Sequence, residues 1–204
     1  MTHITPVVIF PPDGLDPVRE TPRANIAGTL QEWCWPIQLW FDRQRRAFQD
    51  NRLIVSFGEV RVVSATEPVD MTQGNPWYAV RALLASHDYM FGENQGQEMT
   101  LAYLAGWKHP AYAGHAGGGL AVVGEAAWDF AARGDLSYAL GLIAHEVAHL
   151  VWSMGHGDAT RTPPDLLRPY PAPLEASVLY RQDGGQPRVL GVSGPVSCPA
   201  EPVL

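Results

Sequence analysis

The residues best suited to chemistry in this sequence are two histidines and a glutamate in the run HEVAH at 145–149. Residues four apart lie on one face of a helix, so a helix here places His145 and His149 one turn apart. Two imidazoles at that spacing can bind one Zn²⁺, and Glu146 between them can act as general base on a zinc-bound water. The pattern therefore favours a hydrolytic zinc site over two surface histidines that flank an incidental glutamate.

The segment around this motif is typical of a buried helix. Apolar residues recur on both sides of the histidines, at Leu140, Leu142, Ile143, Val147, Leu150 and Val151. Asp135 is a suitable N-cap, which predicts a helix over 136–152. Structural zinc sites usually use cysteines, and the two cysteines, Cys34 and Cys198, are far from the motif. A catalytic site with three protein ligands fits this sequence better, and two free thiols are favoured over one disulfide bond.

A third histidine, His156, follows His149 by seven residues, and the whole run invites a family comparison. The run HEVAHLVWSMGH resembles the metzincin zinc-peptidase motif HExxHxxGxxH. Trp152 stands at the Gly position of the family, and the third histidine comes one residue late. Gly155 directly precedes His156 and can supply the turn, because glycine adopts left-handed conformations at little cost.

The resemblance implies a zinc ligand set of His145, His149 and His156. Two other residues stay open as the third ligand, since carboxylates also bind zinc. Asp158 is close to the motif, and Glu175 would be the ligand in a gluzincin-type peptidase. The Pro-rich sequence before Glu175 disfavours the helix that normally presents such a glutamate.

A second likeness lies further along the chain, in the run SVLY at 177–180. It is similar to the tight turn with a methionine beneath the zinc of metzincins, with Leu179 in place of the methionine. Leucine and methionine are close in volume, so the exchange is mild. The resemblance implies apolar support under the ligands, and a hydrogen bond from Tyr180 to the developing oxyanion. A short buried strand and a packed aromatic ring are the alternatives.

Together these likenesses imply a zinc-dependent endopeptidase. Glu146 would take a proton from the zinc-bound water that attacks the peptide carbonyl, and later pass it to the leaving amine. The substrate would be a peptide or protein that pairs with an exposed sheet edge, for which the run LAVVGEAAW at 120–128 is the candidate. A non-catalytic zinc-binding protein derived from a peptidase is the alternative from another class. No organic cofactor is predicted, because the glycines at 117–119 lack a phosphate-binding context.

The elements that must position this motif alternate along the chain. Strands are predicted at 6–10, 52–65, 99–107 and 120–130, and helices at 25–49, 76–91 and 136–152. Pro36 either kinks the first helix or begins a new one, and Gly58 indicates a bulge. The segment 109–119 is expected to be a Gly-rich loop, whose His109 and His115 are better explained as surface residues than as a second metal site. The order predicts an α/β fold with a twisted, mostly parallel sheet, packed helices and a central HExxH helix.

The length of 204 residues suits one domain over 1–204. Within it we expect a sheet and helix subdomain over 1–155. The Pro-rich remainder, 156–204, is expected to form a small irregular C-terminal subdomain.

Charge and hydropathy exclude several classes of partner. The net charge of −7 and the pI near 5.4 argue against nucleic acid or an anionic membrane. No apolar run is long enough for a membrane span. The N-terminus lacks the basic and apolar regions of a secretory signal, so the compartment stays open: secreted if a signal has been removed, cytoplasmic otherwise.

Overall fold

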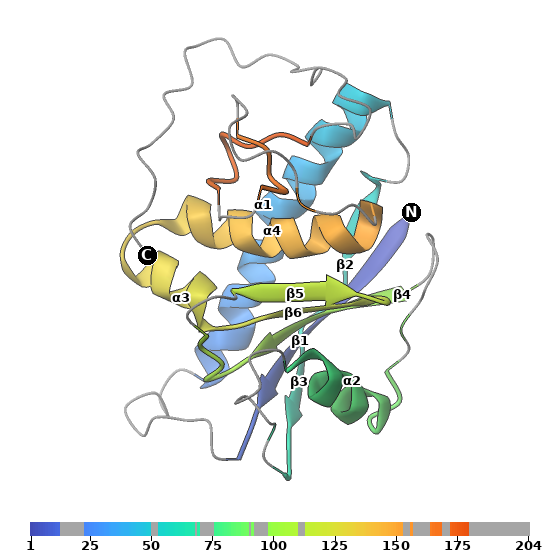
Figure 1. Ribbon diagram of the computed structural model, residues 1–204, viewed down its shortest axis with the longest axis vertical. Helices are drawn as coiled ribbons and strands as arrows, with labels where there is room; N and C mark the ends of the chain where they lie inside the picture. The colour runs from blue at the N-terminus through green and yellow to red at the C-terminus, as the bar shows by residue number, and fades with distance from the viewer. Residues whose placement is uncertain are drawn as a thin grey trace.

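The computed structural model describes residues 1–12, 23–49, 53–67, 69, 76–89, 91, 98–109, 113–152, 156, 164–168 and 172–179. The elements in these residues are β1 (Thr2–Phe10), α1 (Arg23–Phe48), β2 (Val55–Phe57), β3 (Arg61–Ser64), α2 (Trp77–Ala85), β4 (Glu98–Leu104), β5 (Gly114–Gly117), β6 (Leu120–Val123), α3 (Glu125–Ala132) and α4 (Leu136–Trp152). The strands form one sheet, in which every pairing is parallel except that of β5 with β6 (Figure 1). The predicted α/β class, with a mostly parallel sheet and packed helices, is confirmed.

β1 lies inside the sheet, whose order is β2-β1-β4-β6-β5, with β3 paired to the later part of β1. Thr2 pairs with Val55, an offset of 53 (55 − 2), whereas Val7 pairs with Arg61, an offset of 54 (61 − 7). The interruption between β2 and β3 therefore holds one extra residue, which is the property of a bulge. Gly58 lies in this interruption, where the sequence predicts a bulge within the single strand 52–65.

Helices cover both faces of the sheet. Alternate residues of β1 belong to different clusters: Ile4 and Val8 pack with residues of α1 and α4, while Val7 and Ile9 pack with residues of α2. In Figure 1, α4 lies over β5 and β6, and α2 lies on the opposite side of the sheet. A sheet that is covered on both faces explains why the strands read as nearly continuous apolar runs.

The predicted strand over 120–130 is wrong beyond Val123. The strand ends before Gly124, where a Cβ atom would lie 2.4 Å from the Trp107 carbonyl oxygen. α3 then begins at Glu125, whose buried carboxylate accepts hydrogen bonds from the Tyr103 hydroxyl and the Gly106 N–H, both at 2.7 Å. The close approach requires a glycine, and the new direction of the chain is fixed by a buried acidic residue in the first turn of the helix.

α1 is longer than any other described helix and runs through Pro36 as one element. Its buried face carries Trp40, whose indole N–H donates to the Ser177 carbonyl at 3.1 Å. One turn later, the Gln44 side-chain oxygen accepts from the Leu179 N–H at 3.2 Å. Side chains of α1 thus hold the segment 172–179 through hydrogen bonds to the backbone of that segment.

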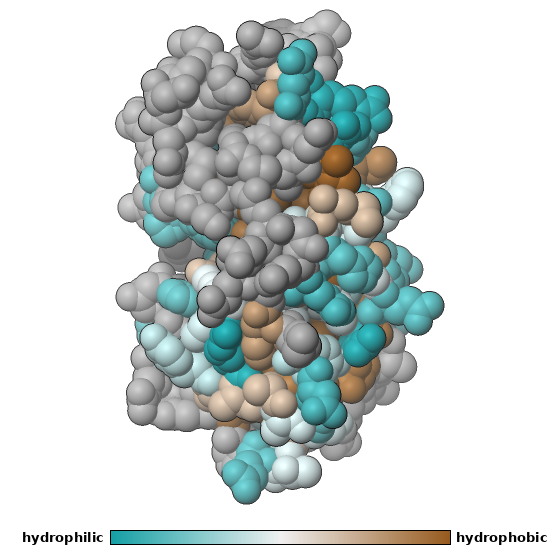
Figure 2. All heavy atoms as spheres, turned by 90° about the vertical axis from the view of Figure 1, so that its right-hand side faces the viewer, coloured by the Kyte–Doolittle hydropathy of each residue, from teal (hydrophilic) through white to brown (hydrophobic). Residues whose placement is uncertain are grey.

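The surface on the face shown in Figure 2 carries hydrophobic side chains in separate places among hydrophilic ones. Large exposed apolar residues include Trp35 and Leu39, which are one turn apart on α1. Cys34 beside them is buried and free, and burial raises the pKa of its thiol to about 12. None of the described helices combines the length and the apolar character needed to cross a bilayer.

We expect Gly141→Ala to destabilise the protein. Gly141 lies in α4 against the segment 172–179, and a Cβ there would lie 1.8 Å from the Ala172 carbonyl oxygen. The backbone must shift, so the free energy of unfolding should fall by roughly 1–3 kcal/mol, which chemical denaturation measures.

The matched control is Gly28→Ala. Gly28 lies exposed in α1 with no atom within 4 Å of its added Cβ. This variant should gain roughly 0.5–1 kcal/mol, because alanine favours a helix over glycine. Equal effects of the two substitutions would contradict the packing of α4 on residues 172–174.

Candidate metal centre

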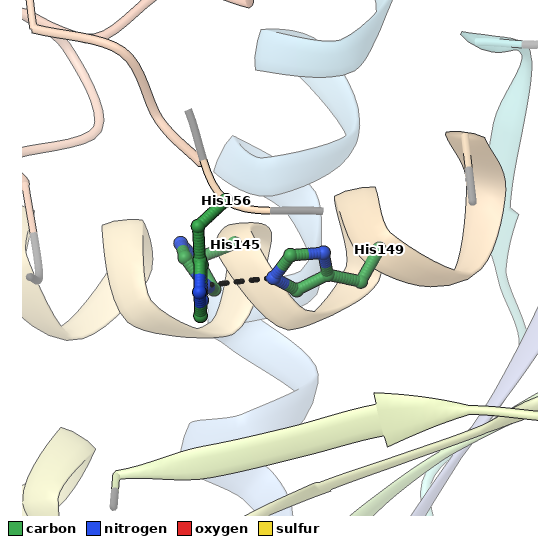
Figure 3. Close-up of side chains that lie close together, drawn as sticks. All are labelled: His145, His149 and His156. Carbon is green, nitrogen blue, oxygen red and sulfur yellow. Dashed lines mark hydrogen bonds between the residues drawn. The ribbon is translucent and has the colours of Figure 1, made fainter. Parts of the chain in front are cut away.

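Three histidines converge beside α4. His145 and His149 come from the helix itself, and His156 comes from the chain that follows it (Figure 3). Each ring offers a nitrogen, and these nitrogens all lie within 4.8 Å of one another. In the described part of the chain, no other group of three or more His, Cys, Asp or Glu side chains has this arrangement.

His145 is buried and held by a hydrogen bond to the backbone. Its ring is 9% exposed, and its Nδ1 lies 2.7 Å from the Leu166 carbonyl oxygen. A carbonyl only accepts, so Nδ1 carries the hydrogen and Nε2 has a lone pair that can accept. Burial, and then the neighbouring His149 and His156, lower the pKa of His145 to about 3. The ring is therefore neutral at physiological pH, which is the form that binds metals.

The donor set fits a zinc ion. Nε2 of His145 lies 3.0 Å from Nε2 of His149. Two nitrogens that bind one tetrahedral zinc at about 2.0–2.1 Å lie about 3.3 Å apart. Without a metal, the His149 Nε2–H donates to the Nε2 lone pair of His145, and the two nitrogens are close enough for one cation to take the place of that hydrogen. His156 is exposed, so the cluster also has a side that faces solvent.

Glu146 lies between α4 and the sheet. Its side chain is buried, 6% exposed, and burial raises the pKa of its carboxyl group to about 8. Its Oε1 lies against Gly114 of β5: a Cβ added to that glycine would be 2.6 Å from Oε1. The carboxylate therefore occupies space that any side chain at position 114 would take.

β5 is the strand at this end of the described sheet, and the predicted edge is wrong. The run LAVVGEAAW was expected to form the edge, but its strand, β6, lies between β4 and β5. β5 itself falls in the segment that was expected to be a loop. It contains two glycines and no β-branched residue, so strand propensity gave no signal. A glycine in a strand often marks a close backbone approach, which is the one sequence feature that could have indicated Gly114.

The other candidate residues lie elsewhere or outside the described residues. Glu175 is exposed and is not part of the histidine cluster. His115 lies on the other face of β5, with its ring 6.3 Å from the Trp77 ring, and burial lowers its pKa. Asp158 and Tyr180 lie outside the described residues.

The run 177–179 packs near the site. Leu179 is fully buried in the same core cluster as the apolar residues of α4. Val178 is bridged to Asp165, in the segment whose Leu166 carbonyl meets His145. The supporting role that the sequence predicts for Leu179 stays a prediction.

We expect removal of the His156 imidazole, but not of the Glu175 carboxylate, to reduce zinc binding. His156→Ala leaves two protein ligands, whereas Glu175→Ala changes an exposed side chain outside the cluster. Elemental analysis after dialysis against a weak chelator measures the zinc bound by each variant. Loss of zinc in Glu175→Ala alone would assign the third ligand to Glu175 and contradict the cluster.

Comparison with known proteins finds distant likenesses among solved structures. No family model matches the sequence. No curated protein matches it either. One similar solved structure is a zinc-dependent peptidase from Methanocorpusculum labreanum (strain Z), 15% identical, with a TM-score of 0.43, over 85% of this chain and 94% of that chain. Another is an archaemetzincin from Methanopyrus kandleri, 17% identical, with a TM-score of 0.38, over 85% of this chain and 84% of that chain.

Proposed function

We propose that this protein is a zinc-dependent endopeptidase with a metzincin-like ligand set. The observation that carries the proposal is the convergence of three imidazoles at a helix whose buried glutamate, next in sequence to one of them, lies against the edge strand of the described sheet. A structural zinc site needs ligands alone. A hydrolase also needs a base and a surface that aligns the substrate, and Glu146 and β5 supply candidates for both.

In this proposal His145, His149 and His156 hold the zinc ion. A zinc ion at such a site polarises the scissile carbonyl and makes water a better nucleophile at neutral pH. His145 contributes a neutral ring that the Leu166 carbonyl holds in one tautomer. This second hydrogen bond also fixes the orientation of the ring, as is usual for histidine ligands.

Glu146 is the proposed general base and acid. Its carboxylate takes a proton from the attacking water and later donates it to the leaving amine. Burial raises the pKa of this carboxyl group to about 8, which suits the acid half of the cycle, and the charge of a bound zinc ion would favour the carboxylate that the base half needs. The contact with Gly114 keeps Oε1 next to the backbone of β5.

The proposed substrate is an extended peptide that pairs with β5. Among the described strands, β5 pairs on one side only, with β6. Its other side can therefore add a strand by backbone hydrogen bonds. A peptide there would lie beside Glu146, since that side chain touches the first residue of β5.

Tyr180 remains the proposed donor to the developing oxyanion, on the resemblance of 177–180 to the metzincin turn. The rival proposal is a zinc-binding protein without catalysis. The presence of Glu146 argues against this rival, because zinc binding alone does not require a buried carboxylate at that position.

We expect Glu146→Gln to lose peptide hydrolysis while it keeps its zinc. The amide has nearly the same shape but cannot accept the proton, so kcat should fall roughly 10²–10⁴-fold. The measurement is hydrolysis of casein and of a peptide library, with zinc content determined on the same samples. Equal inactivity of wild type and variant, both with tightly bound zinc, would establish the non-catalytic rival.

Gly114→Ala should also reduce kcat with zinc retained, because the new methyl group displaces the Glu146 carboxylate. A misplacement of about 1 Å in such a group costs roughly 100-fold in rate. Gly117→Ala is the control in the same strand, since no atom lies within 4 Å of its added Cβ, and its activity should match wild type. Similar activities of the two variants would mean that β5 does not position Glu146.

A further inference from the structure

A single peptide group lies behind the proposed ligand His145. It joins Leu166 to Leu167, and its carbonyl oxygen accepts the hydrogen of His145 Nδ1 at 2.7 Å. The N–H of the same peptide group points the other way and donates to Asp165 Oδ1 at 3.0 Å. Because a peptide group is planar, fixing its N–H also fixes the direction of its carbonyl.

Asp165 is built into this turn. Its side chain is buried, 3% exposed, and accepts from the backbone two residues on, which is the geometry of an Asx turn. The neighbouring backbone is tied to residue 178: the Leu166 N–H donates to the Val178 oxygen at 2.9 Å, and the Val178 N–H donates to the Pro164 oxygen at 3.0 Å. Neither of these two backbone hydrogen bonds involves the Leu166–Leu167 peptide group itself, whose rotation Asp165 restrains.

The restraint has an electronic consequence as well as a geometric one. A carboxylate that accepts from a peptide N–H polarises the peptide, so its carbonyl becomes a stronger acceptor. A stronger acceptor on Nδ1–H raises the basicity of the other ring nitrogen, Nε2. In this structure Nε2 of His145 is the atom that faces His149.

We propose that Asp165 is a positioning residue that sets the zinc affinity of His145 through the Leu166–Leu167 peptide. The inference rests on the proposed zinc site and extends it to a carboxylate that does not touch the metal. Asp165 acts in two ways, by holding the carbonyl in line with Nδ1 and by increasing its strength as an acceptor.

The experiment compares zinc affinity, by competition with a chromogenic chelator, in wild type, Asp165→Ala and Asp165→Asn. Loss of a hydrogen bond made directly to a ligand typically weakens metal binding about 10–100-fold, so for Asp165→Ala, which acts one step further out, we expect a loss of about 10-fold. Asp165→Asn keeps an acceptor oxygen but loses the charge, so its affinity should lie between the other two. If the alanine variant does not fold, the asparagine variant carries the comparison.

Ser177→Ala is the matched control. It also removes one buried side-chain hydrogen bond in the C-terminal part, from Ser177 Oγ to the Pro173 oxygen at 2.6 Å, and it does not touch the Leu166–Leu167 peptide. Its zinc affinity should equal that of wild type, even if the metal-free protein loses as much thermal stability as Asp165→Ala. Equal losses of affinity in both variants would make the effect one of general stability and overturn the proposal.

A readout that needs no metal is the tautomer of His145, from ¹⁵N NMR of the metal-free protein. Wild type should carry its hydrogen on Nδ1, and Asp165→Ala should show a mixture of tautomers. A wild-type affinity for zinc in Asp165→Ala, or an unchanged tautomer, overturns this inference alone. A wild-type protein that binds no zinc overturns the proposed function and this inference with it.

Discussion

α4 is buried on nearly all of its sides, and that burial constrains the elements around it. Ile143, Val147 and Val151 are fully buried, yet the same helix has to leave imidazole nitrogens within reach of a metal. The sheet, α1 and the C-terminal segment each cover a part of the helix, and β5 lies along Glu146. The polar face is about one turn long, so the groups that touch this turn decide its chemistry.

Much of the scaffold could be predicted from the sequence, because the spacing of apolar residues in a long segment indicates its secondary structure. The predicted helix over 136–152 is the observed α4, since its apolar spacing and its start are both local signals. β5 could not be predicted in this way. Its glycines, histidine and alanine have little preference for a strand, and they form one because they pair with β6. The boundary at Gly124 likewise depends on Trp107, a contact that no local pattern reveals.

The candidate site likewise has a part that local sequence predicts and a part that depends on remote residues. His145, Glu146 and His149 belong to one short motif, so their shared position follows from helical spacing alone. The groups that orient them are remote: the Leu166 carbonyl is 21 residues from His145, and Gly114 is 32 residues (146 − 114) from Glu146. A backbone carbonyl leaves no signature in the sequence, and a glycine does not show which side chain will approach it. Only the folded structure brings them to the motif.

The central place of β1 bears on how the chain assembles. β1 pairs with β4 through contacts such as His3 with Glu98, which are 95 residues apart (98 − 3). Closing so long a loop costs chain entropy before pairing offsets it, so sheets of this kind form slowly. During synthesis the apolar residues 7–9 of β1, which face both sides of the sheet, emerge long before β4 can cover the edge of β1. Until β4 has been synthesised, one edge of β1 is thus unpaired and prone to aggregation, and folding yield should depend on how well that edge is shielded until residue 104 has emerged.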